Sequence, residues 1–448
     1  MAIGRVSAAV DAAREAVAHA DAMPDSDPNA AFQCLRTRAV HANAVHAAGR
    51  LAEAADLFAD AERRQKAQGS KYPPELPSAQ GAEYCDLLLS RGDAADVKRR
   101  AASAVKLAQH NNLLLDIALD TVSLGRAALA LSPSPRLRGE GRGEGQTQDK
   151  PVPGSAPHPA SAPHSVSAPL PSPLPVKNGE RGSFENGARG PVEFGERGHL
   201  AEAAAYLDAA VDGLHGAGQS WLTPGGYLAR AALHRVTGAH LLAKQDLNDA
   251  ADIADRSGMR LFQCDIALER ARLALSLSPS LRGEGQGEGQ PQVGLVPGSA
   301  HHPVPARHPV PAPHPVPAPL PVSAPHLSPL PVKNGERGQS DDPIATAIGC
   351  VDTAAAIIAD TGYHRRVPDL ALVRSGIALA HGNAAAAQPH LAEAKRWIDD
   401  GWGCHVAEYD ALIAQLSPPA SLPSPGDAPS PPSPSPAAKT MWQRIFGG

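Results

Sequence analysis

Residues able to do chemistry are scarce in this sequence, and none stands in a known catalytic spacing. The 448 residues contain no GxxxxGK(S/T) phosphate loop, no HExxH pair and no GxSxG turn. The glycine-rich stretches LRGEGRGEG and LRGEGQGEG follow proline-rich sequence instead of a strand, a context that does not suit phosphate binding. We therefore expect neither an enzyme nor a nucleotide-hydrolysing switch, and we assign no catalytic, cofactor-binding or metal-binding residue.

Histidine and cysteine side chains could hold a metal ion, but their positions do not favour one. His41 and His46 lie five residues apart on one predicted helix, which is poor spacing for a shared ion, so we interpret them as surface or partly buried. The histidines of the proline-rich segments stand in HPVPAP-like contexts, where weak metal capture is the minor alternative. The cysteines are odd in number and lack CxxC spacing, which favours buried free thiols over a disulfide or metal framework. They are Cys34, Cys85, Cys264, Cys350 and Cys404.

Aromatic and arginine side chains are better candidates, because they are enriched at the hot spots of protein interfaces. The densest polar cluster is Tyr363-His364-Arg365-Arg366, which is either the exposed start of a helix or a contact patch at the open end of a groove. Four further residues either contact a partner or pack between helices. They are Tyr84, Trp221, Tyr227 and Arg230.

These candidates must be positioned by helices, because the strongest signal in the chain is an internal repeat. The stretch 363–400 predicts two helices joined by a turn at Gly382, and the second helix carries Ala387, Leu391 and Ala394 on one face. The same face recurs in five other second helices, as Ala54/Phe58/Ala61, Val97/Ala101/Ala104, Ala203/Leu207/Ala210, Ala243/Leu247/Ala250 and Ala347/Val351/Ala354. The preceding helices keep a small residue at the matching contact point, namely Ala42, Cys85, Gly125, Ala231, Ala271 and Ser375.

A glycine turn followed by this Ala-x3-large-x2-Ala pattern resembles the tetratricopeptide repeat. The period of about 40 residues is similar to the variant found in bacterial regulators and in helical regions attached to signalling ATPases. GAEYCDLLLSRGD (81–93) and GYHRRVPDLALVRSGIALA (362–380) carry the resemblance most clearly. The first helices lack the bulky aromatic residues of the family, so the family's partner contacts are not carried over. The resemblance implies an all-α, right-handed α-solenoid that binds a protein or peptide.

The expected solenoid occupies residues 1–131, 198–277 and 342–416. Its helices are predicted at 4–21, 31–48, 51–67, 79–90, 93–109, 113–131, 199–215, 224–237, 240–256, 261–276, 342–360, 367–380, 384–399 and 404–416.

Two low-complexity insertions, 132–197 and 278–341, interrupt the array at the turn between the two helices of a repeat. They are copies of each other, since both contain LRGEG, VPGSA and SPLPVKNGERG. Dense proline removes backbone donors and favours polyproline II, so we predict disordered loops. They resemble translated interspersed DNA elements of GC-rich bacterial genomes and are interpreted as neutral. The alternative is a pair of proline-rich arms that dock into an aromatic groove.

The segment 417–448 is rich in serine and proline and is predicted to be disordered before it ends in TMWQRIFGG. Trp442, Ile445 and Phe446 would share one helical face, so this end is either an ordinary frayed terminus or a docking peptide that folds into a groove.

The charge balance of the chain indicates which kind of partner it binds, and its hydropathy indicates where it is located. The chain has 41 Lys+Arg against 46 Asp+Glu, which argues against nucleic acid as the main partner. The start lacks a signal-peptide pattern and no apolar run approaches the length of a membrane span, so we expect a cytoplasmic protein.

The leading hypothesis for the function is a scaffold or adaptor that binds a protein or peptide in its concave groove. The alternative is a sensor or regulatory arm whose ATPase or effector is on another chain. An enzyme with an unrecognised site is the third possibility.

Overall fold

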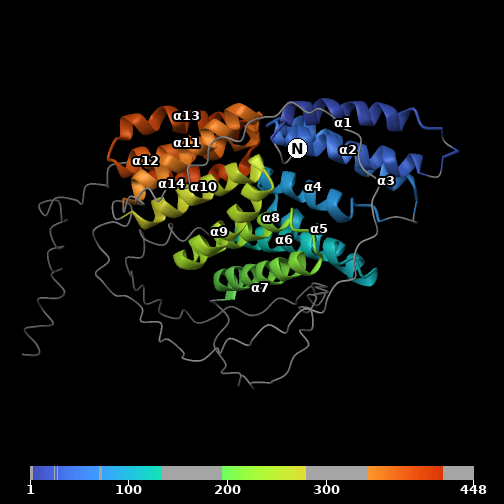
Figure 1. The fold of residues 1–448 in the computed structure, drawn as a ribbon, viewed down its shortest axis with the longest axis horizontal. Helices are drawn as coiled ribbons and strands as arrows, with labels where there is room; N and C mark the ends of the chain where they lie inside the picture. Colours follow the sequence, from blue (N-terminus) through green and yellow to red (C-terminus); the bar gives the residue numbers. More distant parts are fainter. Residues whose placement is uncertain are drawn as a thin grey trace, which may run out of the picture.

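The structure, a computed structural model, describes residues 4–24, 26–27, 29–69, 73–132, 194–278 and 342–416. These residues form fourteen α-helices and no strand, which confirms the all-α prediction (Figure 1). Most of both insertions and the whole tail, including Trp442, Ile445 and Phe446, lie outside the described residues. The helices are α1 (Val6–Asp21), α2 (Ala30–Ala47), α3 (Leu51–Ala67), α4 (Ser78–Arg91), α5 (Ala94–His110), α6 (Leu114–Ala130), α7 (Phe194–Gly216), α8 (Thr223–Val236), α9 (His240–Arg256), α10 (Arg260–Leu277), α11 (Pro343–Thr361), α12 (Val367–Ala380), α13 (Ala384–Asp399) and α14 (Val406–Leu416).

From α2 to α13, successive helices pack as pairs, and each first helix of a pair also contacts the first helix of the next pair. The pairs α6·α7 and α10·α11 form although long segments separate their helices in the chain. The contact is close at Gly125, where an added Cβ would lie 2.6 Å from the Leu207 side chain. A residue without a side chain at this point therefore lets a leucine from the partner helix enter.

The repeated small residues form the spine of the molecule. All six contact points on the first helices are buried, and so are the central residues of all six second-helix faces. Small side chains allow the helix backbones to approach, and each buried Leu or Phe between them contributes about 1.5–3 kcal/mol. The last position of the second-helix face is also buried in five pairs, but Ala104 in α5 is only half-buried.

Helix boundaries agree with the predicted ones within three residues except at the start of α7. This helix begins at Phe194, five residues before the predicted 199. Gly195 and Gly198 favoured a later start because glycine weakens helices, but the residues between them are good helix formers and the helix continues through both.

Contrary to the expectation that no apolar run approaches the length of a membrane span, the helix α11 is long and apolar enough to cross a membrane, with 19 residues and a mean hydropathy of 1.4. Of its apolar stretch, 33% is buried within the protein. It nevertheless occupies the same place in its pair as α9 and α13 do in theirs. Its buried face, which includes Ala347, Val351 and Ala354, lies in one core with residues of α10 and α12. Packing within the array therefore accounts for part of its apolar character.

The two ends of the array meet. Figure 1 shows the N-terminal helices α1 and α2 beside the C-terminal helices α11 and α13. An added Cβ at Gly403 would lie 2.3 Å from the Arg91 carbonyl oxygen, and one at Gly4 would lie 2.7 Å from the Thr361 side chain. Residues more than 300 positions apart thus approach at the level of the backbone.

Candidate functional site

The contact between the two ends is organised around Asp86 of α4. Arg365, in a 3₁₀ turn before α12, places Nη1 2.7 Å from Asp86 Oδ2, although the two residues are 279 positions apart. Arg126 of α6 places Nη1 2.6 Å from the other oxygen, Oδ1. Burial alone would raise the pKa of Asp86, but the two guanidinium groups hold it well below its usual range. We call His46, Asp86, Ser90, Arg365 and Trp402 the end junction.

His46 contacts both sides of the end junction. Ser90 donates its hydroxyl proton to the Asp86 carbonyl oxygen at 3.1 Å, so His46 Nε2, 3.0 Å away, donates to Ser90 Oγ. Nδ1 then carries the lone pair, and it faces Arg365 Nη1 at 3.5 Å. Burial lowers the pKa of His46 well below its ordinary value, which keeps this ring neutral. Trp402 stacks on it with ring centroids 5.6 Å apart.

This arrangement corrects the interpretation of the histidines. His41 and His46 are both buried, not at the surface. Their spacing in the sequence bears only on a shared metal ion, and it gives no hint that His46 would meet a residue from the other end of the chain.

A second group of charges continues from the end junction into the C-terminal pairs. Asp265 of α10 accepts from Arg366 Nε at 2.7 Å and from the Tyr363 hydroxyl at 3.3 Å. Asp369 of α12 accepts from Arg272 Nη2 at 2.7 Å. Burial would raise the pKa of Asp369, but neighbouring cations, Arg272 among them, hold it below its usual range. These charges are satisfied inside the protein.

The tetrad 363–366 is therefore not the exposed start of a helix. Its last three residues form a 3₁₀ turn in which Arg365 is buried and Arg366 is half-buried, and Tyr363 before it is buried as well. Only His364 is exposed. Three of the four side chains make contacts within the chain.

Tyr84 also lies in the interior. Its ring stacks on Phe58 with centroids 4.8 Å apart and planes 6° from parallel, and the Arg100 guanidinium lies 4.6 Å from its centroid. Arg100 in turn pairs with Glu62 at 2.6 Å and 3.1 Å. Tyr84 thus joins two helix pairs.

The remaining candidates lie around α8 and differ in exposure. Arg230 binds Asp246 through two contacts of 2.7 Å and 3.0 Å, and the Tyr227 hydroxyl is 2.9 Å from His215 Nε2. Trp221, in the connection before α8, is 52% exposed. Of the candidates within the described residues, Trp221 and His364 are the exposed ones.

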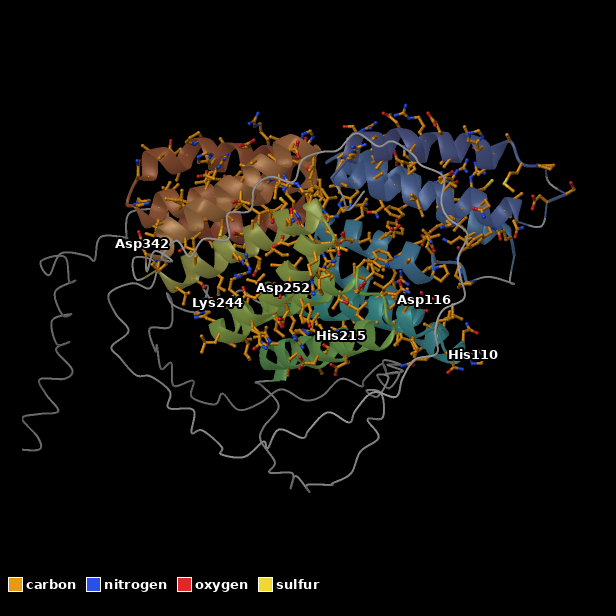
Figure 2. All side chains as sticks on the ribbon, in the orientation of Figure 1. His110, Asp116, His215, Lys244, Asp252 and Asp342 are labelled. Atoms are coloured by element: carbon orange, nitrogen blue, oxygen red, sulfur yellow. The ribbon has the colours of Figure 1, made fainter. Side chains whose placement is uncertain are left out.

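Trp221 belongs to an apolar row that the sequence did not single out. Leu113, the last residue of the α5–α6 turn, and Leu114, the first residue of α6, are 44% and 63% exposed. The end of α7, which leads to Trp221, lies beside the start of α6, because an added Cβ at Gly213 would lie 3.1 Å from the Cβ of Ala118. Figure 2 marks the two turns by His110 and Asp116 on either side of the first turn and His215 at the end of α7. We call Leu113, Leu114 and Trp221 the free edge.

Sequence reasoning missed Asp86 and Trp402, and it considered His46 only as a possible metal ligand. One signal could have found Trp402, because Gly401-Trp402 repeats Gly362-Tyr363 after 39 residues and both glycines have positive φ. Both aromatic residues are buried at the start of a C-terminal unit. No comparable pattern marks Asp86 or His46.

Neither a disulfide nor a cluster of metal ligands is present in the described part of the chain. All five cysteines are free there; Cys85 and Cys264 are buried as predicted, whereas Cys34 and Cys350 are half-buried and Cys404 is exposed. Burial raises the pKa of Cys85 to about 12, which leaves it a poor nucleophile. No group of three His, Cys, Asp or Glu side chains within these residues could hold a metal ion.

No protein-family model, curated protein or solved structure matches this chain. The function of the protein must therefore be sought in the geometry of the molecule itself.

Proposed function

We propose that this protein is a right-handed α-solenoid of the tetratricopeptide kind that acts as a scaffold and binds a protein or peptide. Sequential helix pairs, a buried small residue on every first helix and a period of about 40 residues support the family. In such arrays each pair is stabilised by its neighbours, and the remaining surface is available for binding.

The observation that carries the binding role is the free edge. Leu113, Leu114 and Trp221 are large apolar side chains on adjacent turns, and exposing them together to water is unfavourable. Tryptophan is also the residue type most enriched at interface hot spots. A partner that covers the free edge would gain the free energy of burying these side chains.

The concave groove is a less suitable surface in this conformation. Tyr363, Arg365 and Arg366, which were expected to contact a partner there, are paired with Asp86 and Asp265 inside the chain. A ligand would have to displace these pairs. The free edge requires no such displacement, so we place the partner there.

The chemistry of the edge selects the partner. Exposed Asp212 lies one turn before the end of α7, and Asp208, 65% exposed at its side chain, lies one turn earlier. An amphipathic helix or extended peptide with apolar anchors and flanking Lys or Arg residues fits this surface.

The test compares two edges. The variant Leu113→Ser/Leu114→Ser/Trp221→Ala removes the free edge, and Leu241→Ser/Leu242→Ser removes two exposed leucines from the start of α9 as a matched control. A partner is captured by cross-linking to the full chain, purified and titrated against all three proteins. We expect at least tenfold weaker binding for the free-edge variant only, with unchanged melting temperatures. Equal binding by all three proteins would refute the proposal.

A second candidate, a regulatory arm, is favoured by the end junction. Interfaces that are polar open more readily than apolar ones, and this junction depends on charge pairs and one stacked histidine. A partner could then shift the population of open and closed arrays. Site-specific fluorophores at Asp11 and Lys395 would report this change as a partner-dependent distance. An unchanged distance at saturating partner would exclude it.

A further inference from the structure

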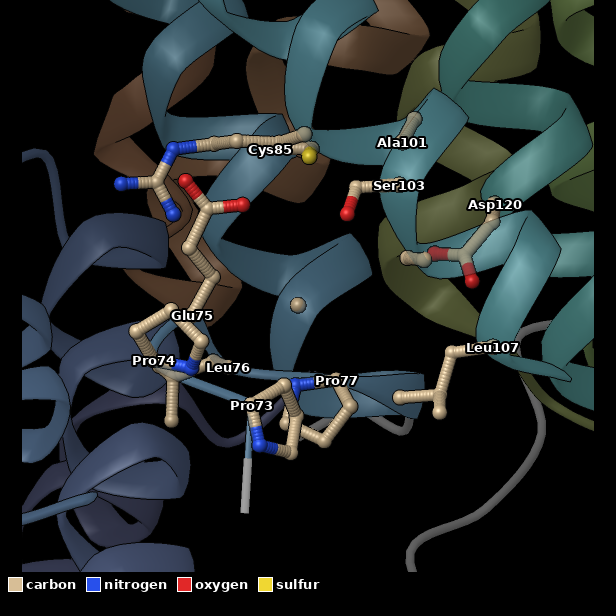
Figure 3. A pocket seen from close by; sticks show the side chains of 13 residues that line it. Pro73, Pro74, Glu75, Leu76, Pro77, Cys85, Ala101, Ser103, Leu107 and Asp120 are labelled. Carbon is tan, nitrogen blue, oxygen red and sulfur yellow. The ribbon is translucent and has the colours of Figure 1, made fainter. Parts of the chain in front are cut away.

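A cavity of about 220 Å³ lies between α4, α5, α6 and the segment that precedes α4. Figure 3 shows Pro73, Pro74 and Pro77 on one side, with Ser103, Leu107 and Asp120 on the other. No residue of the end junction or the free edge lines it. It is therefore a separate feature that the proposed binding role does not use.

The chemically unusual residue in this cavity is Asp120 of α6. Its side chain is 1% exposed, and its Oδ2 has no hydrogen-bond partner among the described residues. Burial, reinforced by Asp116 one turn earlier on the helix, raises the pKa of Asp120 to about 8. A buried carboxyl group without a partner destabilises a fold, so its presence calls for a ligand.

The repeat itself shows that Asp120 is a departure from the pattern. It stands five residues before the contact point Gly125. The same position in the other first helices is occupied by uncharged residues, of which Ile266 and Leu370 are buried and apolar. Those residues are Thr37, Gln80, Gly226, Ile266 and Leu370. An aliphatic residue therefore fits this position elsewhere in the array, and packing does not require a carboxyl group.

The opposite wall departs from the pattern as well. Ala104, which lines the cavity, is half-buried where its five counterparts are fully buried. The connection from Gln68 to Pro77 is long, and its second half is fixed as a wall: Leu76 N donates to Glu62 at 3.1 Å, and Glu75 pairs with Arg99 at 2.6 Å. The space is thus preformed and bounded by proline rings on one side.

The charges around the cavity leave Asp120 without a cation from the described part of the protein. Arg100 is the positively charged side chain among the lining residues, and it is held by Glu62 at 2.6 Å and by Asp96 at 2.9 Å. Glu75 is paired with Arg99, and the Cys85 thiol stays protonated because burial raises its pKa. A cation that pairs with Asp120 must come from outside.

We propose that this cavity binds a small organic amine with an apolar body, whose ammonium group pairs with Asp120 while its carbon skeleton contacts the proline rings, Ala104 and Leu107. A dry cavity of about 150 Å³ accommodates benzene, so the space available here suits a ligand of roughly seven to ten non-hydrogen atoms. The fixed wall and the small lining residues select for size, and the carboxylate selects for charge.

The test uses two probes of equal size and different charge, cyclohexylamine and cyclohexanol, titrated calorimetrically into the full chain. We expect the amine to bind at least tenfold more tightly than the alcohol at pH 9. The affinity for the amine should increase between pH 7 and pH 9 as Asp120 ionises, because the amine remains protonated across this range.

Three outcomes would contradict the proposal. Equal affinity for both probes would mean that the site is only an apolar cavity without selectivity for charge, which overturns the proposal. Tighter binding of the alcohol, weakening as the pH rises, would mean that a protonated Asp120 donates to a neutral ligand, which also overturns it. Absence of binding by either probe would refute the proposal as well.

Three variants distinguish the effect of the Asp120 carboxylate on binding from an effect of the substitution on folding. Asp120→Asn keeps the shape and should lose the preference for the amine. Asp120→Leu introduces the residue type that Leu370 provides at the equivalent position, so it should lose the preference for the amine and melt at a higher temperature. The control Asp252→Asn removes a carboxylate from an exposed position on α9, labelled in Figure 2, and should bind as the natural protein does. Unchanged amine affinity in a folded Asp120→Asn protein would contradict the assignment.

Discussion

Within the helix pairs the contacts are small and apolar, as at Gly125 against Leu207, whereas at the end junction they are charged, as at Asp86 between Arg126 and Arg365. Apolar burial stabilises each pair whatever the rest of the chain does, because its contribution scales with the area removed from water. A buried ion pair contributes little net free energy, since desolvation offsets most of the attraction, but an unpaired buried charge is strongly destabilising. The spine therefore provides stability, and the end junction selects which surfaces meet.

The largest effect is expected from the spine. Leu207→Ala leaves a hole opposite Gly125 and should lower the free energy of unfolding by about 3–5 kcal/mol. Urea denaturation of the full chain measures this loss. The matched control Leu242→Ala, on the exposed side of α9, should change stability by less than about 0.5 kcal/mol. Similar losses in both variants would show that the spine has no special role.

At the end junction, Arg365→Met should cost about 3 kcal/mol, because Asp86 keeps Arg126 but loses its second cation. The double variant Arg365→Met/Asp86→Leu should recover part of this loss, since the buried carboxylate is gone and the charge that loses its partner, Arg126, is 35% exposed at its side chain and can be solvated. A double-mutant cycle by urea denaturation gives the coupling energy. A double variant that is less stable than either single variant would indicate that the pair contributes net stability.

A smaller effect is expected from the backbone approach at Gly403. Gly403→Ala places a methyl group where the Arg91 carbonyl oxygen lies, so the two ends must separate at a cost of about 2 kcal/mol. Hydrogen exchange should become faster around Ser90 and Gly92 while the middle pairs stay protected. Gly349→Ala in α11, where a methyl group meets open space, is the control and should be neutral or slightly stabilising. Uniform exchange changes across the chain would contradict a local opening.

The smallest effect concerns pH. Burial raises the pKa of Asp120 to about 8 and that of Glu83 to about 7, so the folded state holds protons that the unfolded state has released. The stability from these two groups is fully present below their unfolded pKa values near 4 and is lost as the pH rises through 7 and 8. Asp86, whose pKa is lowered, acts in the opposite sense, and its contribution is lost on acidification.

The free energy of unfolding should therefore decrease by about 1–2 kcal/mol from pH 7 to pH 9, and the melting temperature should decrease with it. Asp120→Asn should flatten this alkaline decline. A decline that persists unchanged in this variant would mean that other groups cause it.

The spine could be predicted from the sequence because its signal is local and periodic. The positions of Phe58, Leu247 and Leu391 repeat with the turns, and each packs against the small residue that its own pair supplies. The end junction could not, since Arg365 and Asp86 are far apart in the chain and a charged residue on a helix looks exposed. The cavity could not be predicted for a related reason. Asp120 is a single departure from the repeat, whereas a periodic pattern is recognised from the positions that do repeat.

The approach of Gly403 to the α4–α5 turn also constrains the order in which this protein can mature. During synthesis, the first two helix pairs emerge long before Arg365 and Trp402 exist, so Asp86 and His46 must wait, solvated, until the C-terminal pairs are made. Closing so long a span is entropically demanding and slow compared with forming each hairpin. A chain that ends before residue 401 therefore leaves the His46 ring and the Arg91 carbonyl without Trp402 and Gly403, which contact them in the folded protein.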